Sequence, residues 1–140
     1  GPWSSDGYRS KITALIGELN LEAFVTITGK VSVEQLQEHY RRAKVFCLLS
    51  RSESFGIPAI EAQAFGTPTV VADVCAPPEV AGPGGMVITP GDLEHGASCL
   101  QSLLTDQKVW QAYSAKALAN AERFRWEKVS QPLNQFLMDV

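Results

Sequence analysis

The chain has 140 residues, enough for one domain with a sizeable hydrophobic core. Hydrophobic residues make up 45% and charged residues 19%, and the formal net charge of -3 argues against a nucleic-acid partner or a basic membrane-binding surface. Three widely spaced cysteines argue against a disulfide framework or a zinc site, and neither a membrane span nor a signal peptide is indicated. We therefore expect a cytoplasmic globular domain.

In chain order, the first third of the sequence predicts two helix–strand pairs. Residues 5–21 carry apolar side chains at helical spacing, and the β-branched and aromatic stretch 23–28 predicts a buried strand. Ser32 and Gln35 then form a capping-box pattern at the start of a second helix. The apolar run 44–50 predicts a strand that is covered on both faces.

The alternation of helices and strands continues to residue 90. A short helix is expected over residues 58–65, with Pro58 at its first position and Gly66 at the left-handed C′ position. Strands are expected at 67–73 and 84–90. Together with the earlier elements, this pattern predicts an α/β fold with a parallel sheet and helices on both faces, in which ligands bind at the carboxyl ends of the strands.

The last third of the sequence is expected to be helical. Asp92 and Asp106 are placed as N-caps of two helices. A final helix is expected over residues 124–140, and Pro132 should kink it.

The stretch ESFGIPAIE, from Glu53 to Glu61, joins the second expected strand to the next helix. Gly56 would let the backbone approach a ligand closely, and the helix start would present free N–H groups and a positive dipole end to a phosphate. Glu61, one turn into that helix, could accept two hydroxyls of a ribose, and Glu53 could reach hydroxyls beyond the phosphates. From spacing alone, two solvated charges beside an ordinary turn are the commoner explanation.

A longer stretch favours a binding site over two ordinary solvated charges. It comprises residues 48–92, LLSRSESFGIPAIEAQAFGTPTVVADVCAPPEVAGPGGMVITPGD. It resembles the donor-binding segment of the retaining GT-B glycosyltransferases of family 4, the glycosyl transferases group 1. The two glutamates eight apart, the enclosed Phe-Gly and Pro, and the later Gly-x-Pro, Pro-Glu-Val and Pro-Gly-Asp elements all stand in order. The resemblance implies a Rossmann-like doubly wound sheet, the C-terminal half of a GT-B fold.

The resemblance also implies roles for individual residues. Glu53 matches the first motif glutamate, which contacts the transferred sugar and is the candidate catalytic residue. The turn whose backbone amides approach the donor matches Ser54, Phe55, Gly56 and Ile57. Glu61 matches the ribose-binding glutamate, and Lys30 and Val31 match the loop against which the nucleobase rests. No tightly bound metal or cofactor is implied; the donor substrate is a nucleotide-diphosphate sugar.

By the same resemblance, residues 1–140 would be a single donor-binding domain of a two-domain retaining hexosyltransferase. The first strand–helix–strand of that domain, with its basic diphosphate-gripping loops, finds no counterpart in the sequence, and DVCAPPE departs from the common Gly-Gly pair before Pro-Glu. We expect the isolated chain to be inactive. An acceptor glycan, lipid or small molecule, and any peripheral membrane contact, would be reached through the N-terminal domain.

Two other interpretations follow from the same residues. The chain could be a nucleotide-sugar binding module that does not catalyse. It could also be an unrelated α/β interaction domain in which the turn before residue 58 is ordinary.

Overall fold

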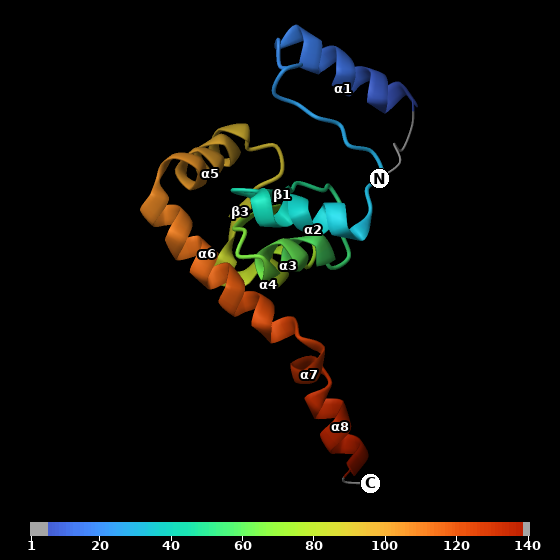
Figure 1. Cartoon of the computed structure of the whole chain (residues 1–140), viewed down its shortest axis with the longest axis vertical. Coiled ribbons are helices and arrows are strands. Elements are labelled where there is room, and N and C mark those ends of the chain that lie inside the picture. The colour runs from blue at the N-terminus through green and yellow to red at the C-terminus, as the bar shows by residue number, and fades with distance from the viewer. Residues whose placement is uncertain (1–5, 139–140) are drawn as a thin grey trace. The chain divides into compact units, whose positions relative to one another are not determined.

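The computed structural model describes residues 6–138, which belong to two compact units, residues 1–36 and 37–140 (Figure 1). The first unit contains helix α1 (Asp6–Glu18), and α2 (Val33–Arg42) contains the boundary between the units. Each unit is described by itself.

The expected strand at residues 23–28 does not form. The segment is irregular, and its side chains are exposed, with Phe24 82% accessible to solvent. A strand needs a neighbouring strand to pair its N–H and C=O groups. Within the described part of residues 1–36 there is no second extended segment, so the β-branched sequence alone does not make a strand.

The larger unit confirms the other three expected strands and adds short helices after the second of them. Its strands are β1 (Phe46–Leu48), β2 (Thr69–Ala72) and β3 (Gly85–Ile88). Its helices are α3 (Ile57–Ala64), α4 (Pro77–Ala81), the 3-10 turn η1 (Gly82–Gly84), α5 (Leu93–Thr105), α6 (Gln107–Ala121), the 3-10 turn η2 (Glu122–Phe124), α7 (Trp126–Val129) and α8 (Gln131–Met138).

The three strands form one parallel sheet in the order β1–β2–β3. Thr69 of the central strand stands opposite Phe46 on one side and Gly85 on the other. The carboxyl ends of all three strands therefore lie at the same edge of the sheet, where the loops after β1 and β3 begin.

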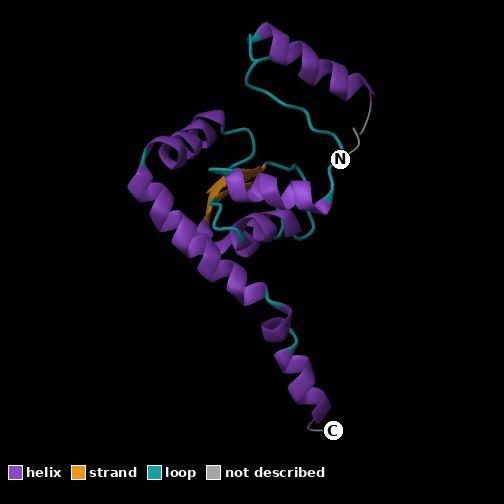
Figure 2. Ribbon diagram, viewed as in Figure 1, coloured by secondary structure: helices purple, strands orange, loops and turns teal. Residues whose placement is uncertain are grey.

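Helices cover both faces of the sheet, as the alternation of elements predicts (Figure 2). Val70 packs on one face with Ile88 and with Cys99 and Leu103 of α5. Its neighbour Val71 points to the other face; it packs there with Ala59 of α3 and Ala81 of α4. Successive side chains of a strand point to opposite faces, so β2 belongs to two cores and all four of its residues are buried.

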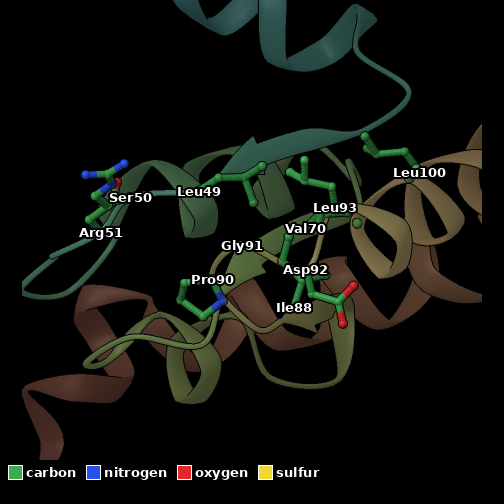
Figure 3. Close-up of a pocket in the computed structure, with 12 residues that line it drawn as sticks. Leu49, Ser50, Arg51, Val70, Ile88, Pro90, Gly91, Asp92, Leu93 and Leu100 are labelled. Atoms are coloured by element: carbon green, nitrogen blue, oxygen red, sulfur yellow. The ribbon is translucent and has the colours of Figure 1, made fainter.

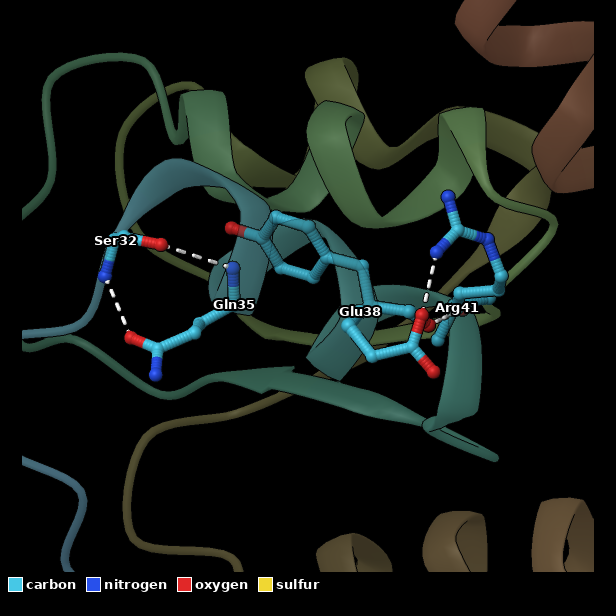
Figure 4. A network of polar contacts seen from close by, with 6 residues as sticks. Ser32, Gln35, Glu38 and Arg41 are labelled. Carbon is cyan, nitrogen blue, oxygen red and sulfur yellow. Dashed lines mark hydrogen bonds and ion pairs between the residues drawn. The ribbon is translucent and has the colours of Figure 1, made fainter.

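Most of the expected helix ends are confirmed. Ser32 and Gln35 form a reciprocal capping box: the Ser32 N–H donates to Gln35 Oε1 (2.9 Å) and the Gln35 N–H donates to Ser32 Oγ (3.3 Å) (Figure 4). Asp92 and Asp106 accept backbone N–H groups at the starts of α5 and α6. The expected final helix is interrupted at Ser130, and Pro132 is the second residue of α8.

Candidate functional site

The turn between β1 and α3 depends on a glycine. Gly56 is the N-cap residue of α3 and has φ +88°, in the left-handed region that side chains disfavour. A Cβ at this position would also lie 3.2 Å from Leu48 Cδ2 and 3.3 Å from Pro77 Cγ. The glycine therefore lets the turn pass tightly between the end of β1 and the start of α4.

The amino end of α3 carries no side-chain cap. The helix begins at Ile57, one residue earlier than expected, so Pro58 occupies its second position. A proline there costs nothing, because an N–H in the first turn has no partner within the helix. The first-turn amides that remain lack a side-chain acceptor, which is the arrangement that helix-bound phosphates use.

Glu61 lies one turn into α3 and has a partner in α2. The hydroxyl of Tyr40 donates a 3.0 Å hydrogen bond to Glu61 Oε2. Glu61 is exposed, whereas Tyr40 is only 5% exposed. Burial raises the pKa of the Tyr40 phenol, and the hydrogen bond to Glu61 raises it further, so the phenol is a protonated donor at neutral pH.

The remaining motif residues lie together in the loop before α3. Glu53 is half-buried, and its Oε1 accepts the backbone N–H of Ser54 at 3.0 Å. The ring of Phe55 makes an edge-to-face contact with Phe124 of η2, with ring centroids 6.0 Å apart. Ile57 is exposed at the start of the helix. The structure thus gathers Glu53 to Ile57 in one turn directly ahead of the helix that carries Glu61.

Lys30 and Val31 belong to the other unit, residues 1–36. They immediately precede the capping box of α2; Lys30 is exposed and Val31 is half-buried.

A buried polar network holds α3 in place. The amide of Gln63 donates to Thr69 Oγ1 (3.0 Å) and to the carbonyl oxygen of Ala81 (2.8 Å). Asn120 of α6 donates to Gln63 Oε1 (2.7 Å) and to the carbonyl oxygen of Val80 (2.9 Å). The helix that carries Glu61 is therefore fixed to β2, α4 and α6 by buried hydrogen bonds.

The far end of α3 is fixed as well. Gly66, with φ +75°, donates its N–H to the Gln63 carbonyl, and the N–H of Thr67 donates to that of Ala62. These two bonds form a Schellman motif, and the positive φ confirms the left-handed C′ position that was expected at Gly66. The Thr67 hydroxyl then donates to the Tyr40 carbonyl oxygen at 2.7 Å, which ties the end of α3 to α2.

A hollow of about 410 Å³ lies beside this turn, at the carboxyl ends of β1 and β3 (Figure 3). Its wall is mostly apolar and comes from the end of β1, from β2 and β3, from the loop 90–92 and from α5. Ser50 and Arg51 line it on the β1 side, whereas neither motif glutamate does. The hollow and the turn are thus neighbouring features of the same sheet edge.

Among residues 6–138, no three His, Cys, Asp or Glu side chains gather as a metal site would require. None of the helices described there has both the length and the apolar character needed to cross a membrane.

Sequence reasoning missed the polar partners of the site. From the sequence pattern, Tyr40 is expected only to lie on the apolar face of α2. Nothing in the pattern distinguishes Gln63 or Asn120 from other helix residues. A partial signal existed for Tyr40, because a buried tyrosine hydroxyl usually finds an acceptor. Which acceptor it finds depends on how α2 packs against α3, and no local pattern contains that information.

Comparison with known proteins shows which family has a similar sequence. A family model described as "Glycosyl transferases group 1" matches residues 5–121. The chain is 36% identical over 118 residues to the O-antigen chain mannosyltransferase B of Escherichia coli, and 35% identical over 121 residues to the D-inositol 3-phosphate glycosyltransferase of Rhodococcus opacus. These alignments cover 82% and 85% of the chain but only 30% and 27% of the two relatives.

Among solved structures, the sucrose-phosphate synthase of Thermosynechococcus elongatus superposes with a TM-score of 0.84 at 29% identity. The superposition covers 99% of this chain and 36% of the synthase. The chain therefore matches about a third of each of these larger proteins.

Proposed function

The chain belongs to the glycosyl transferases group 1 family and has the fold of the C-terminal, Rossmann-like half of a GT-B glycosyltransferase; from this premise we propose that it is the donor-binding part of a retaining hexosyltransferase. The donor would be a nucleotide-diphosphate sugar and the acceptor a hydroxyl group in glycan or glycoconjugate biosynthesis.

The observation that carries the proposal is the amino end of α3. It is entered through Gly56 in a left-handed conformation, has no side-chain cap, and carries Glu61 one turn further on. Helix-end amides favour a diphosphate, and an ionised carboxylate can only accept hydrogen bonds, as binding of the two ribose hydroxyls requires. One turn thus offers groups for both parts of a nucleoside diphosphate.

We assign the roles along the motif accordingly. Backbone amides of the turn that contains Ser54, Phe55, Gly56 and Ile57 approach the diphosphate and the sugar. Glu61 binds the ribose, and Glu53, as the candidate catalytic residue, positions the hexose. Lys30 and Val31 contribute to the nucleobase site.

The proposed reaction requires that the reacting groups be positioned and that the charge on the departing diphosphate be stabilised. The bond between the anomeric carbon and the diphosphate oxygen breaks, and the acceptor oxygen bonds to that carbon on the same face of the ring while its hydroxyl proton passes to the departing diphosphate oxygen. The helix-end amides stabilise the negative charge that develops on the departing diphosphate. No nucleophilic side chain and no tightly bound metal or cofactor is required from this chain.

We further propose that residues 1–140 form a single donor-binding domain of a cytoplasmic two-domain enzyme. The chain spans 30% and 27% of two curated relatives, both glycosyltransferases by name. Acceptor contacts, to a glycan, a lipid or a small molecule, would come from the other domain. The 140-residue chain alone would then bind donor without transferring sugar.

The first experiment is a titration of the isotopically labelled chain with UDP-, GDP-, ADP- and dTDP-sugars, followed by NMR. We expect saturable shifts at the Gly56 amide with at least one of them. Absence of saturable shifts at Gly56 with all four would overturn the proposal and favour an unrelated α/β interaction domain.

The second experiment is calorimetry on Glu61→Ala with the nucleotide sugar that binds best. Loss of the charge-assisted bonds to ribose should weaken binding by roughly ten- to a hundredfold. Glu94→Ala is the matched control, because Glu94 is also an exposed acid in a helix that begins at this sheet edge. Unchanged affinity of Glu61→Ala would remove Glu61 from the site.

A further inference from the structure

The ring and the backbone of Tyr40 are held by contacts that do not involve its hydroxyl. Its ring contacts Phe46 of β1 edge to face, with centroids 5.6 Å apart, and stacks on Phe65 at 6.2 Å. Its carbonyl oxygen accepts the Thr67 hydroxyl. Aromatic contacts and a backbone bond therefore fix where the phenol oxygen lies, independently of Glu61.

The phenol oxygen is aimed at one carboxylate oxygen of Glu61. A glutamate on an exposed helix surface otherwise samples several rotamers. A ligand that binds only one of them must restrict the side chain, and the lost conformational entropy weakens binding. The 3.0 Å bond from Tyr40 to Oε2 restricts that choice. A carboxylate has about four lone-pair positions, so the bond to Tyr40 leaves acceptor capacity for two further hydroxyls.

We infer that Tyr40 is a positioning residue for donor binding: its hydroxyl holds the Glu61 carboxylate in the orientation that accepts the ribose hydroxyls. The inference rests on the proposed role of Glu61. It adds a residue that the sequence motif does not contain and that acts only through its neighbour.

The test is a double-mutant cycle built from Tyr40→Phe and Glu61→Ala, with affinities for UDP, GDP and ADP measured by calorimetry. Phenylalanine keeps the ring contacts with Phe46 and Phe65 and removes only the hydroxyl. We expect Tyr40→Phe to weaken binding of the best-binding nucleotide by about threefold to tenfold, the effect of one typical hydrogen bond. In the Glu61→Ala background the same change should have no further effect.

A second arm separates positioning from folding. Each variant is titrated with the same nucleotide and with its 2′,3′-dideoxy form, which offers Glu61 no ribose hydroxyls. A positioning role predicts that Tyr40→Phe weakens only the hydroxylated nucleotide, whereas a folding defect weakens both alike. Tyr113→Phe, which removes a phenol hydroxyl from α6, is the matched control and should change neither affinity.

The outcomes distinguish the inference from the proposed function. If Glu61→Ala leaves every affinity unchanged, the ribose role of Glu61 fails and the inference fails with it. If Glu61→Ala weakens binding but Tyr40→Phe does not, or the two losses simply add, the site stands and Tyr40 has no positioning role. Equal losses for the ribo and dideoxy nucleotides would also overturn the inference.

Discussion

Replacing Gly56 by alanine tests whether the turn needs a glycine for two separate reasons. The first is conformational, because an alanine held at φ +88° in the left-handed region costs about 1–2 kcal/mol. The second is steric, because the new Cβ would lie 3.2 Å from Leu48 Cδ2 and 3.3 Å from Pro77 Cγ. Overpacking of this kind costs about 1–3 kcal/mol. Together the two costs predict a loss of about 2–5 kcal/mol in the free energy of unfolding.

Gly91 provides the matched control. It also has φ +88°, but a Cβ there would meet no atom within 4 Å. Gly91→Ala should therefore carry the conformational cost alone, about 1–2 kcal/mol. The difference between the two variants isolates the crowding against Leu48 and Pro77.

Urea unfolding followed by circular dichroism measures both variants against the unmodified chain. We expect the midpoint to fall for Gly91→Ala and to fall further for Gly56→Ala. Equal midpoints for the two variants would refute the steric half of the reasoning. A Gly56→Ala variant as stable as the parent would refute both halves.

Two further predictions concern buried hydrogen-bonding groups. Asn120→Ala removes the donor to Gln63 Oε1 and to the Val80 carbonyl, and should lower the free energy of unfolding in urea by about 2–4 kcal/mol. The control Asn134→Ala, on the exposed α8, should lower it by less than about 0.5 kcal/mol. Similar losses in the two variants would contradict the role of the network. For Tyr40, the folded-state pKa is raised, so its contribution to stability is complete below the unfolded value of about 10 and is lost as the pH rises toward the folded value. Unfolding measured between pH 7 and 11 should therefore show a steeper alkaline decline for the parent than for Tyr40→Phe, and parallel declines would contradict the raised pKa.

Local patterns predicted local structure well. The capping box at Ser32, the caps at Asp92 and Asp106 and the left-handed Gly66 each depend on atoms within a few residues, and all four are present. The strands at 44–50, 67–73 and 84–90 were also predictable, because short continuous apolar runs that alternate with helices are typical of parallel strands covered on both faces.

Features that depend on distant partners were not predictable. The stretch 23–28 has the composition of a strand, but a strand also requires a second strand beside it. The bond from Tyr40 to Glu61 joins residues 21 apart, and the bond from Asn120 to Gln63 joins residues 57 apart. The motif located the candidate site, but the side chains that support it come from packing.

The anchoring of α3 has a consequence for redesign. This helix has only eight residues, yet it is fastened to α2 through Thr67 and to β2, α4 and α6 through Gln63. A helix of eight residues that is held by buried hydrogen bonds through Gln63 and Thr67 has little freedom to tilt. Under the proposed function, work on a new donor preference should therefore randomise the loop ahead of the helix and leave the helix itself unchanged.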